Sequence, residues 1–204
     1  MIRIFSVPKI VSGFYSKKIW RIPSSGKSIY LTFDDGPTLE TTEWILNLLN
    51  KYQAKATFFC VGENASRYPD LMVTMKENGH SLGNHTNNHL NGMQTDDIEY
   101  LKNVLKCAEV IDSKLFRPPY GRMKSRQAKE ILKQHFKIIM WSVLSYDFDQ
   151  RVSPSKIFKR ITRQTKPGCI VVFHDNVKAM DNLSTVLPNY LAFCKEKGYE
   201  FRAL

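Results

Sequence analysis

Long apolar runs are missing from this chain of 204 residues. A helix that crosses a bilayer needs roughly 20 consecutive apolar residues, and no stretch of the sequence approaches that length. The first 23 residues contain cations, but they lack the uninterrupted apolar core and small-residue cleavage site of a secretory leader. We therefore predict no transmembrane segment and no signal peptide, and we expect a protein that is cytoplasmic or peripheral to the membrane.

Cysteine is scarce and widely spaced. Cys60, Cys107, Cys169 and Cys194 lie far apart and form no C-x-x-C pair. Disulfide frameworks and structural zinc sites are built from recognisable cysteine spacings, and small disulfide-rich domains are secreted. We therefore expect all four cysteines to be buried, reduced thiols.

Acidic residues are sparse in one part of the chain. Residues 114–166 contain 14 Lys and Arg but only 3 Asp and Glu, and this segment accounts for the whole net charge of +11. Such an excess suits either solvated helix faces, the interpretation we favour, or contact with an anionic surface. No nucleic-acid-binding motif accompanies the charge, so we expect no nucleic-acid partner.

Strand-like and helix-like patterns alternate along the chain. Runs of β-branched and aromatic residues predict strands at 28–33, 55–61, 137–143, 169–174 and 199–203. Helical patterns cover 40–52, a segment starting at Pro69, and 95–112, 125–136, 155–165 and 183–197. In 95–112, the apolar residues Ile98, Leu101, Leu105 and Ala108 recur with helical spacing behind a Thr95 cap, which makes this the clearest of the predicted helices.

This alternation predicts an α/β fold with a mainly parallel sheet covered by helices. The sequence contains no repeats, low-complexity tracts or linker. We therefore expect one domain at residues 27–204, preceded by an N-terminal lead-in at residues 1–26.

Two adjacent carboxylates follow the first predicted strand. Asp34 and Asp35 come directly after an apolar run, and Gly36-Pro37 then ends the strand. Neighbouring anions at the end of a buried strand repel each other and lose hydration, so something must compensate for them. The pattern fits a turn whose aspartates accept backbone N–H groups as well as it fits a functional site.

Two of the five histidines, His85 and His89, are four residues apart. On a helix this spacing would place both imidazoles on one face, where they could share a metal ion. Two imidazoles and a carboxylate match the sites of zinc hydrolases and also of non-haem iron enzymes. A second carboxylate beside the metal favours the hydrolase, because such an enzyme needs a base to take a proton from water.

Four motifs now stand in order along the chain. They are Thr32-Phe33-Asp34-Asp35-Gly36-Pro37, His85-Thr86-Asn87-Asn88-His89, Arg117-Pro118-Pro119-Tyr120-Gly121 and Val172-Phe173-His174. In sequence, spacing and order they resemble the polysaccharide deacetylases of carbohydrate esterase family 4, the NodB homology domain. The resemblance covers residues 27–204 and implies a catalytic domain with the fold of a distorted (β/α) barrel and a mainly parallel central sheet.

The same resemblance implies a metal-dependent hydrolase that removes N-acetyl groups from the amino sugars of a polysaccharide or oligosaccharide. The metal ligands would be Asp35, His85 and His89. They would hold one divalent ion, with Zn²⁺ preferred and Co²⁺ or Ni²⁺ as alternatives.

Roles for the other motif residues follow from the resemblance. Asp34 would be the base and Arg117 its partner, while the backbone N–H of Tyr120 would stabilise the oxyanion. His174 would protonate the leaving amine, and Asp147 would orient that imidazole. Residues expected to contact the substrate are Pro119, Tyr120, Trp141, Phe148 and Phe173, and Thr86 is expected to steady a metal ligand.

One family motif is altered in this chain. A common form is Asp-Ser-x-Asp-Trp, and the chain has Leu144-Ser145-Tyr146-Asp147-Phe148. The carboxylate is kept, but Leu144 and Phe148 change the apolar wall of the site. We therefore keep two alternatives, a deacetylase of a lipid-linked or small N-acyl amino sugar and a non-catalytic, metal-containing glycan-binding module.

Three further polar residues lie outside the motifs, and we expect no role for them in the site. His80 and His135 are expected to be structural or surface residues, and Asp149 is expected to be a turn residue rather than a further carboxylate of the site.

Overall fold

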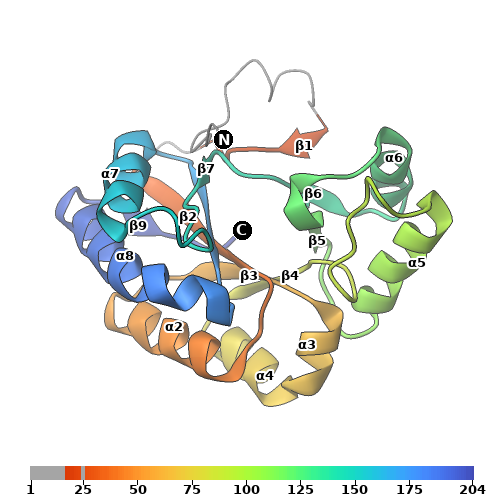
Figure 1. The fold of residues 1–204 in the computed structure, drawn as a ribbon, viewed down its shortest axis with the longest axis horizontal. Coiled ribbons are helices and arrows are strands. Elements are labelled where there is room, and N and C mark those ends of the chain that lie inside the picture. The colour runs from red at the N-terminus through yellow and green to blue at the C-terminus, as the bar shows by residue number, and fades with distance from the viewer. Residues whose placement is uncertain (1–16, 24–25) are drawn as a thin grey trace.

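A computed structural model describes residues 17–23 and 26–204 of the chain (Figure 1). Most of the predicted lead-in, residues 1–26, therefore lies outside the described residues, as does most of the segment considered for a leader. Among the described helices, none has both the length and the apolar character needed to cross a bilayer.

The described residues form one nine-stranded sheet in the order β1-β6-β5-β4-β3-β2-β8-β7, with β9 beside β2. Every ladder in it is parallel. The strands are β1 (Lys18–Ile19), β2 (Ser28–Asp34), β3 (Ala56–Cys60), β4 (Ser81–Asn84), β5 (Leu115–Phe116), β6 (Lys137–Ile139), β7 (Val143–Leu144), β8 (Ile170–His174) and β9 (Glu200–Phe201).

Helices surround this curled sheet on its outside (Figure 1). They are α2 (Leu39–Lys51), α3 (Gly62–Arg67), α4 (Pro69–Glu77), α5 (Asp97–Ala108), α6 (Ser125–Lys133), α7 (Pro154–Gln164) and α8 (Val177–Glu196), and a short 3₁₀ turn, η1, covers Pro119–Gly121. The arrangement confirms the predicted distorted (β/α) barrel with a mainly parallel sheet.

The sheet closes where its first strand, β1, comes near β8 and β7 at its other end. We call this closure the seam, and only a few backbone contacts join its two sides. β1 pairs with β6 at one end, and the residues that follow β1 then reach β8, where Arg21 forms an antiparallel bridge with Cys169. The N–H of Ile22 donates to the carbonyl of Gly168 at 3.0 Å. Residues of the predicted lead-in therefore complete the wall of the barrel.

Aromatic packing supports the strands that carry the site. Phe33 of β2 stacks on Phe58 of β3 at a centroid distance of 5.1 Å and on Phe173 of β8 at 6.0 Å. All three side chains are fully buried. The central strands are thus held at a fixed spacing, which also fixes the spacing of the polar residues at their carboxyl ends.

The predicted strand over 137–143 is two strands in the structure. Only Lys137–Ile139 and Val143–Leu144 are paired, as β6 and β7, on opposite sides of the seam. Three strands, β1, β4 and β5, were not predicted, because they are very short or, in β4 (Ser81–Asn84), mostly polar and small.

The helix predicted over 95–112 is present as α5, but its periodic apolar residues coincide only in part with its buried side, where Leu101 and Ala108 pack against the core. Tyr100, Val104 and Cys107 are fully buried, whereas Ile98 is 68% exposed and Leu105 is 38% exposed. The cap is Asp96, which accepts N–H groups of the first turn, and not Thr95. The helix has apolar residues on two faces, and spacing alone could not tell which face meets the sheet.

Candidate active site

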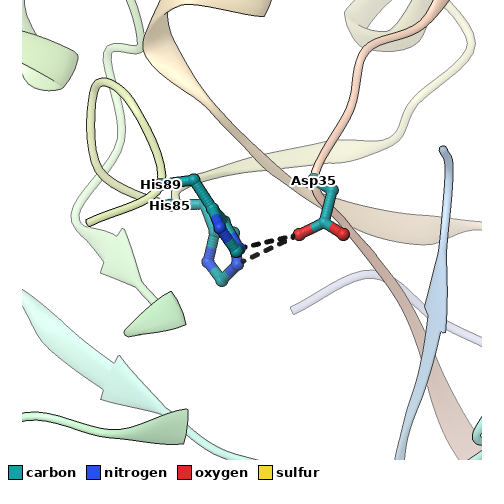
Figure 2. Close-up of side chains that lie close together, drawn as sticks. All are labelled: Asp35, His85 and His89. Carbon is teal, nitrogen blue, oxygen red and sulfur yellow. Dashed lines mark ion pairs between the residues drawn. The ribbon is translucent and has the colours of Figure 1, made fainter. Parts of the chain in front are cut away.

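The three predicted metal ligands lie together at the carboxyl ends of the strands (Figure 2). Asp35 follows β2, and His85 follows β4, the second strand along from β2 in the sheet. One carboxylate oxygen of Asp35, Oδ1, lies 3.6 Å from His85 Nε2 and 3.1 Å from His89 Nε2. One ligand atom from each residue falls within 4.8 Å of the others, so the group could hold a metal ion.

His85 and His89 lie in a loop and not on the helix considered from their spacing. The backbone is left-handed at Thr86 and His89, with φ of 67° and 59°, so the loop curls and brings the two imidazoles to a centroid distance of 5.2 Å. The buried Thr86 hydroxyl accepts the N–H of Leu90 at 3.1 Å, which holds this curl.

Two amide side chains, the buried Asn84 and the partly exposed Asn103, hold the same loop in place. Asn84 accepts the N–H of Thr86 at 2.9 Å and donates to the carbonyl of Val104 in α5 at 2.8 Å. Asn103 of α5 accepts the N–H of Asn87 at 2.8 Å. Neither asparagine was predicted, because Asn84 ends a strand and Asn103 lies within a helix, and no local pattern shows which distant segment such a side chain will contact.

The tautomer of His85 follows from its surroundings. Its Nδ1 lies 2.7 Å from the carbonyl oxygen of Arg117. A carbonyl can only accept, so Nδ1 carries the hydrogen and Nε2 presents a lone pair toward Asp35. Metal-binding histidines in proteins are commonly held in this way. The donor set therefore fits a divalent ion that takes nitrogen and oxygen ligands.

Asp34, at the end of β2, forms a buried ion pair with Arg117. The Arg117 Nη1 donates to Asp34 Oδ1 at 2.7 Å, and Arg117 is fully buried. The remaining guanidinium donors reach Thr32 Oγ1 at 2.7 Å, Ile139 O at 3.2 Å and Met140 O at 3.0 Å. Burial lowers the pKa of Arg117, and the Asp34 charge offsets part of that effect. The guanidinium is thus held rigidly beside the carboxylate.

A second ion pair joins Asp147 to His174, the last residue of β8. His174 Nδ1 lies 2.8 Å from Asp147 Oδ1, and the backbone N–H of His174 donates to Oδ2 at 2.8 Å. Burial alone would lower the pKa of His174, but the charge and hydrogen bond of Asp147 outweigh it and raise the pKa to about 9. The imidazole is therefore protonated at neutral pH and can donate from Nε2.

Asp35 is also kept ionised by its neighbours. Burial alone would raise the pKa of its carboxyl group, but contacts with His85 and His89 and the charge of His174 hold that pKa well below its usual range. Two carboxylates, Asp34 and Asp35, thus remain close together because each has its own cationic or hydrogen-bonding partner. The functional interpretation of this pair is favoured over a simple turn.

A cleft of about 1010 Å³ lies over these groups. Tyr120 lines it from the η1 turn, where its backbone is left-handed with φ of 59°, and its ring packs edge-on against His89 at 4.7 Å. Trp141, Leu144 and Phe148 also line the cleft, so the altered motif does form part of its wall. Phe148 packs edge-on against His174 at 4.8 Å.

Two predicted substrate contacts do not line the cleft. Phe173 is fully buried in the core, because side chains alternate along β8 and the cleft receives those of Val172 and His174. Pro119 is the first residue of the η1 turn, and its side chain is buried. Both residues pack behind the cleft wall. The prediction that Phe173 and Pro119 contact the substrate directly is therefore corrected.

Asp175 and Asn176, directly after His174, were not predicted as site residues. Asp175 accepts the N–H of Gly36 at 2.8 Å through Oδ1 and the hydroxyl of Thr42 at 2.9 Å through Oδ2. Its carboxylate fills the space that a Cβ at Gly36 would need, and burial raises its pKa well above the usual range. The side chain of Asn176 reaches Asp35, at 2.6 Å.

Residues interpreted as structural have structural contacts. His80 is buried and accepts the N–H of Ala56 at 3.1 Å, and burial lowers its pKa to about 4. His135 is exposed just beyond α6. Asp149 accepts the N–H of Arg151 in a turn. The four cysteines are buried and free, as predicted.

Comparisons with known proteins agree with the motifs. The family model described as polysaccharide deacetylase matches residues 21–138. A peptidoglycan-N-acetylglucosamine deacetylase of Bacillus cereus is 34% identical over 193 residues, covering 89% of this chain and 68% of that relative. A chitooligosaccharide deacetylase of Azorhizobium caulinodans is 32% identical over 163 residues, covering 76% of this chain and 77% of that relative.

Solved structures show the same fold. The crystal structure of a peptidoglycan N-acetylglucosamine deacetylase superposes with a TM-score of 0.87 at 32% identity, covering 94% of each chain. The match extends over the carboxyl-terminal strands and helices that lie beyond the family model's range.

Proposed function

The chain belongs to the polysaccharide deacetylase family, and from that membership we propose that it is a metal-dependent hydrolase that removes N-acetyl groups from the amino sugars of a glycan. The observation that carries the proposal is the metal-ligand group of Asp35, His85 and His89, flanked by a carboxylate on one side and a protonated imidazole on the other. Hydrolysis of an amide needs both a base and an acid.

The metal ion would be held by Asp35 Oδ1 and the Nε2 atoms of His85 and His89, with zinc preferred. When bound, such an ion polarises a carbonyl group and lowers the pKa of a nearby water molecule. The chain's own groups then move the protons.

Asp34 is the base in this proposal. Its Oδ1 is engaged by Arg117 at 2.7 Å, so Oδ2 is the atom that accepts the proton from the attacking water. Arg117 balances the charge of the carboxylate and orients it. As the water oxygen bonds to the acetyl carbon, the backbone N–H of Tyr120 donates to the developing oxyanion.

His174 is the acid. Its Nε2 gives a proton to the sugar nitrogen as the carbon–nitrogen bond breaks, since an amine anion would be a very poor leaving group. Asp147 holds Nδ1 and stabilises the charged ring, as the carboxylate does in a catalytic triad. The products are acetate and a free amino sugar, so atoms and charge balance.

The cleft favours an oligosaccharide or polysaccharide over a single sugar. Its volume of about 1010 Å³ is at the upper end of the range for small-molecule sites, and it is lined by the aromatic residues Tyr120, Trp141, Tyr146 and Phe148. A lipid-linked or small N-acyl amino sugar stays as the alternative substrate, and the presence of Asp34, Arg117, Asp147 and His174 argues against a non-catalytic module.

Released acetate provides the direct test. Chitin oligomers, peptidoglycan fragments and lipid-linked amino sugars would be compared as substrates, first with the protein as purified, then after chelation and after added zinc. We expect chelation to abolish turnover and zinc to restore it. Full activity in metal-free protein would contradict the metal-dependent mechanism.

Variants of the adjacent aspartates separate their two roles. Asp34→Asn should keep its zinc but lower kcat by roughly 100-fold to 10,000-fold, because the base is lost. Asp35→Asn should weaken zinc binding, since an amide is a neutral and poorer ligand. Bound zinc would be measured beside turnover in both variants. Loss of zinc from Asp34→Asn with retention in Asp35→Asn would reverse the assignment.

We also propose that α7 contacts an anionic glycan surface. The solvent face of α7 and the turn just beyond it carry exposed cations and no acidic residue. These cations are Lys156, Lys159, Arg160, Arg163 and Lys166. α6 also lies in the basic segment but on the other side of the molecule (Figure 1), and its Lys133 is paired with Glu130. The basic segment therefore divides into two surfaces.

Matched variants can test the α7 contact. One variant would replace Lys156, Lys159 and Arg163 by Ser, and the control would replace Arg126, Lys129 and Lys133 of α6 by Ser. Only the α7 variant should lose affinity for a carboxylate-bearing glycan, and the wild-type affinity should fall with added salt. Equal affinities of the two variants, or a wild-type affinity independent of salt, would contradict the contact.

A further inference from the structure

The two carboxylate oxygens of Asp35 have different surroundings. Oδ1 faces the imidazoles, at 3.6 Å from His85 Nε2 and 3.1 Å from His89 Nε2. Oδ2 accepts a hydrogen bond of 2.6 Å from the side-chain Nδ2 of Asn176. One oxygen is therefore directed at the metal position, and the other is occupied by a neutral donor.

The orientation of the Asn176 amide is determined by a second contact. Asn176 is the N-cap of α8, and its Oδ1 accepts the backbone N–H of Ala179 at 2.9 Å. A backbone N–H can only donate, so the amide oxygen must face Ala179 and the NH₂ group must face Asp35. Flipping the amide would break both hydrogen bonds.

The backbone before Asn176 is held just as firmly. The neighbouring Asp175 donates its N–H to the carbonyl of Asp34 at 3.1 Å, and its buried carboxylate binds Gly36 and Thr42. The loops after β2 and β8 are thus tied together. Asn176 extends from this tie, so its position relative to Asp35 does not depend on a mobile side chain.

We propose that Asn176 is a positioning residue for the metal ligand Asp35, an inference that rests on the proposed function. By occupying Oδ2, it restricts Asp35 to binding the ion through Oδ1 alone. A carboxylate that binds through one oxygen leaves a coordination position open for water or the substrate carbonyl, as a catalytic site requires. Partners of this kind that orient ligands typically contribute roughly 10–100-fold to metal affinity.

The competing explanation is that Asn176 only caps α8. Two substitutions separate the explanations. Asn176→Ser keeps a good cap but has a side chain too short to reach Asp35, whereas Asn176→Ala loses both the cap and the contact. Asn189→Ser is the matched control, because Asn189 is exposed on the same helix and bonds only to the carbonyl of Thr185.

Zinc affinity would be measured with the metal-free full-length protein in competition with a zinc indicator, beside its melting temperature. Asn176→Ser should melt like the wild type yet bind zinc roughly 10–100-fold more weakly. Asn176→Ala should bind zinc equally weakly and melt about 2–4 °C lower. Asn189→Ser should match the wild type in both measurements.

Two results would overturn the inference. One is wild-type zinc affinity in Asn176→Ser, and the other is a loss of affinity in Asn176→Ser that Asn189→Ser shares. The proposed function fails separately, if the wild-type protein binds no divalent ion or if Asp35→Asn binds zinc as tightly as the wild type. If the wild type binds zinc through Asp35 and Asn176→Ser binds zinc as tightly as the wild type, only the inference about Asn176 fails and the proposed function stands.

Discussion

Each reacting side chain in the cleft is paired with a buried group of opposite charge. Asp34 has Arg117 and His174 has Asp147, at 2.7 and 2.8 Å. A buried charge without a partner is costly, so each pair balances the charge of its reactive member and holds that side chain in place. In the second pair, Asp147 also raises the pKa of His174 to about 9, so the acid is protonated at neutral pH.

The role of His174 can be tested through the leaving group. His174→Ala should slow hydrolysis of an N-acetyl amide far more than that of an aryl acetate, because an aryl alcohol leaves without a proton. Asp34→Asn is the control and should slow both substrates. Equal slowing of amide and ester in His174→Ala would contradict the acid role.

The pH dependence should follow the His174–Asp147 pair. The imidazole donates only while protonated, so kcat should fall as the pH rises through the pKa of His174, about 9. Asp147→Asn removes the charge that raises this pKa, and the alkaline limb should then move down by roughly 1–3 pH units. Asp149→Asn is the matched control, because Asp149 lies in a turn with Arg151, and it should leave the alkaline limb unchanged.

At the scale of elements, α5 supports the loop that carries the two metal-binding histidines. Its buried face packs on the sheet, and its Asn103 holds the backbone of the loop between the two histidines. The same helix exposes Ile98 and Leu105, two of the four residues whose spacing predicted the helix. A helix with two apolar faces is oriented by the tertiary contacts that one face can make.

Two substitutions in α5 measure this orientation. Val104→Ala should lower the free energy of unfolding by about 2 kcal/mol, because it empties a fully buried site. Ile98→Ala removes more carbon atoms yet should change that free energy by less than about 0.5 kcal/mol, since Ile98 is 68% exposed. Urea unfolding of both variants makes the comparison, and a larger loss for Ile98→Ala would mean that α5 is rotated.

The sequence was sufficient to predict the residues that can bind a metal ion, because few side-chain types can do so. Asp35, His85 and His89 were grouped by ligand type, and the structure brings them together. The backbone that achieves this differs from the helix considered for the spacing of the two histidines, because Thr86 and His89 adopt left-handed conformations in a loop. A β-branched residue such as Thr86 rarely adopts that conformation, so no local pattern could reveal it.

Supporting residues were harder to predict than reacting ones. Asn84, Asn103 and Asn176 all act through contacts with segments distant in sequence, at Val104, Asn87 and Asp35. An asparagine carries the same local signal in a turn, at a cap and beside a ligand. Only the folded arrangement distinguishes these uses.

At the scale of the whole molecule, the wall of the barrel depends on the seam near Gly168. Gly168 adopts φ of +78°, and a Cβ there would overlap the carbonyl oxygen of Ile22. Ile22 belongs to the segment that crosses from β1 toward β8. A side chain at this glycine would push the crossing segment away from the sheet.

Gly198 offers a matched comparison for the seam. It also has a positive φ, of +73°, but a Cβ there would meet nothing closer than Lys27 Nζ at 3.9 Å. Gly198→Ala should therefore cost only the backbone penalty of about 1–2 kcal/mol. Gly168→Ala should cost roughly 1–3 kcal/mol more because of the clash. Equal losses of unfolding free energy would show that the seam contributes little to stability.

The contact between Gly36 and Asp175 limits the routes by which this site can evolve. The Asp175 carboxylate occupies the position of any Cβ at residue 36. A mutation of Gly36 is therefore harmful while Asp175 is present, and it becomes tolerable only after Asp175 has been replaced by a smaller residue. That first replacement would remove the hydrogen bonds that Asp175 makes to Gly36 and Thr42 beside Asp34 and Asp35, so we expect either single substitution to lower stability. We therefore expect Gly36 and Asp175 to be conserved together among related proteins.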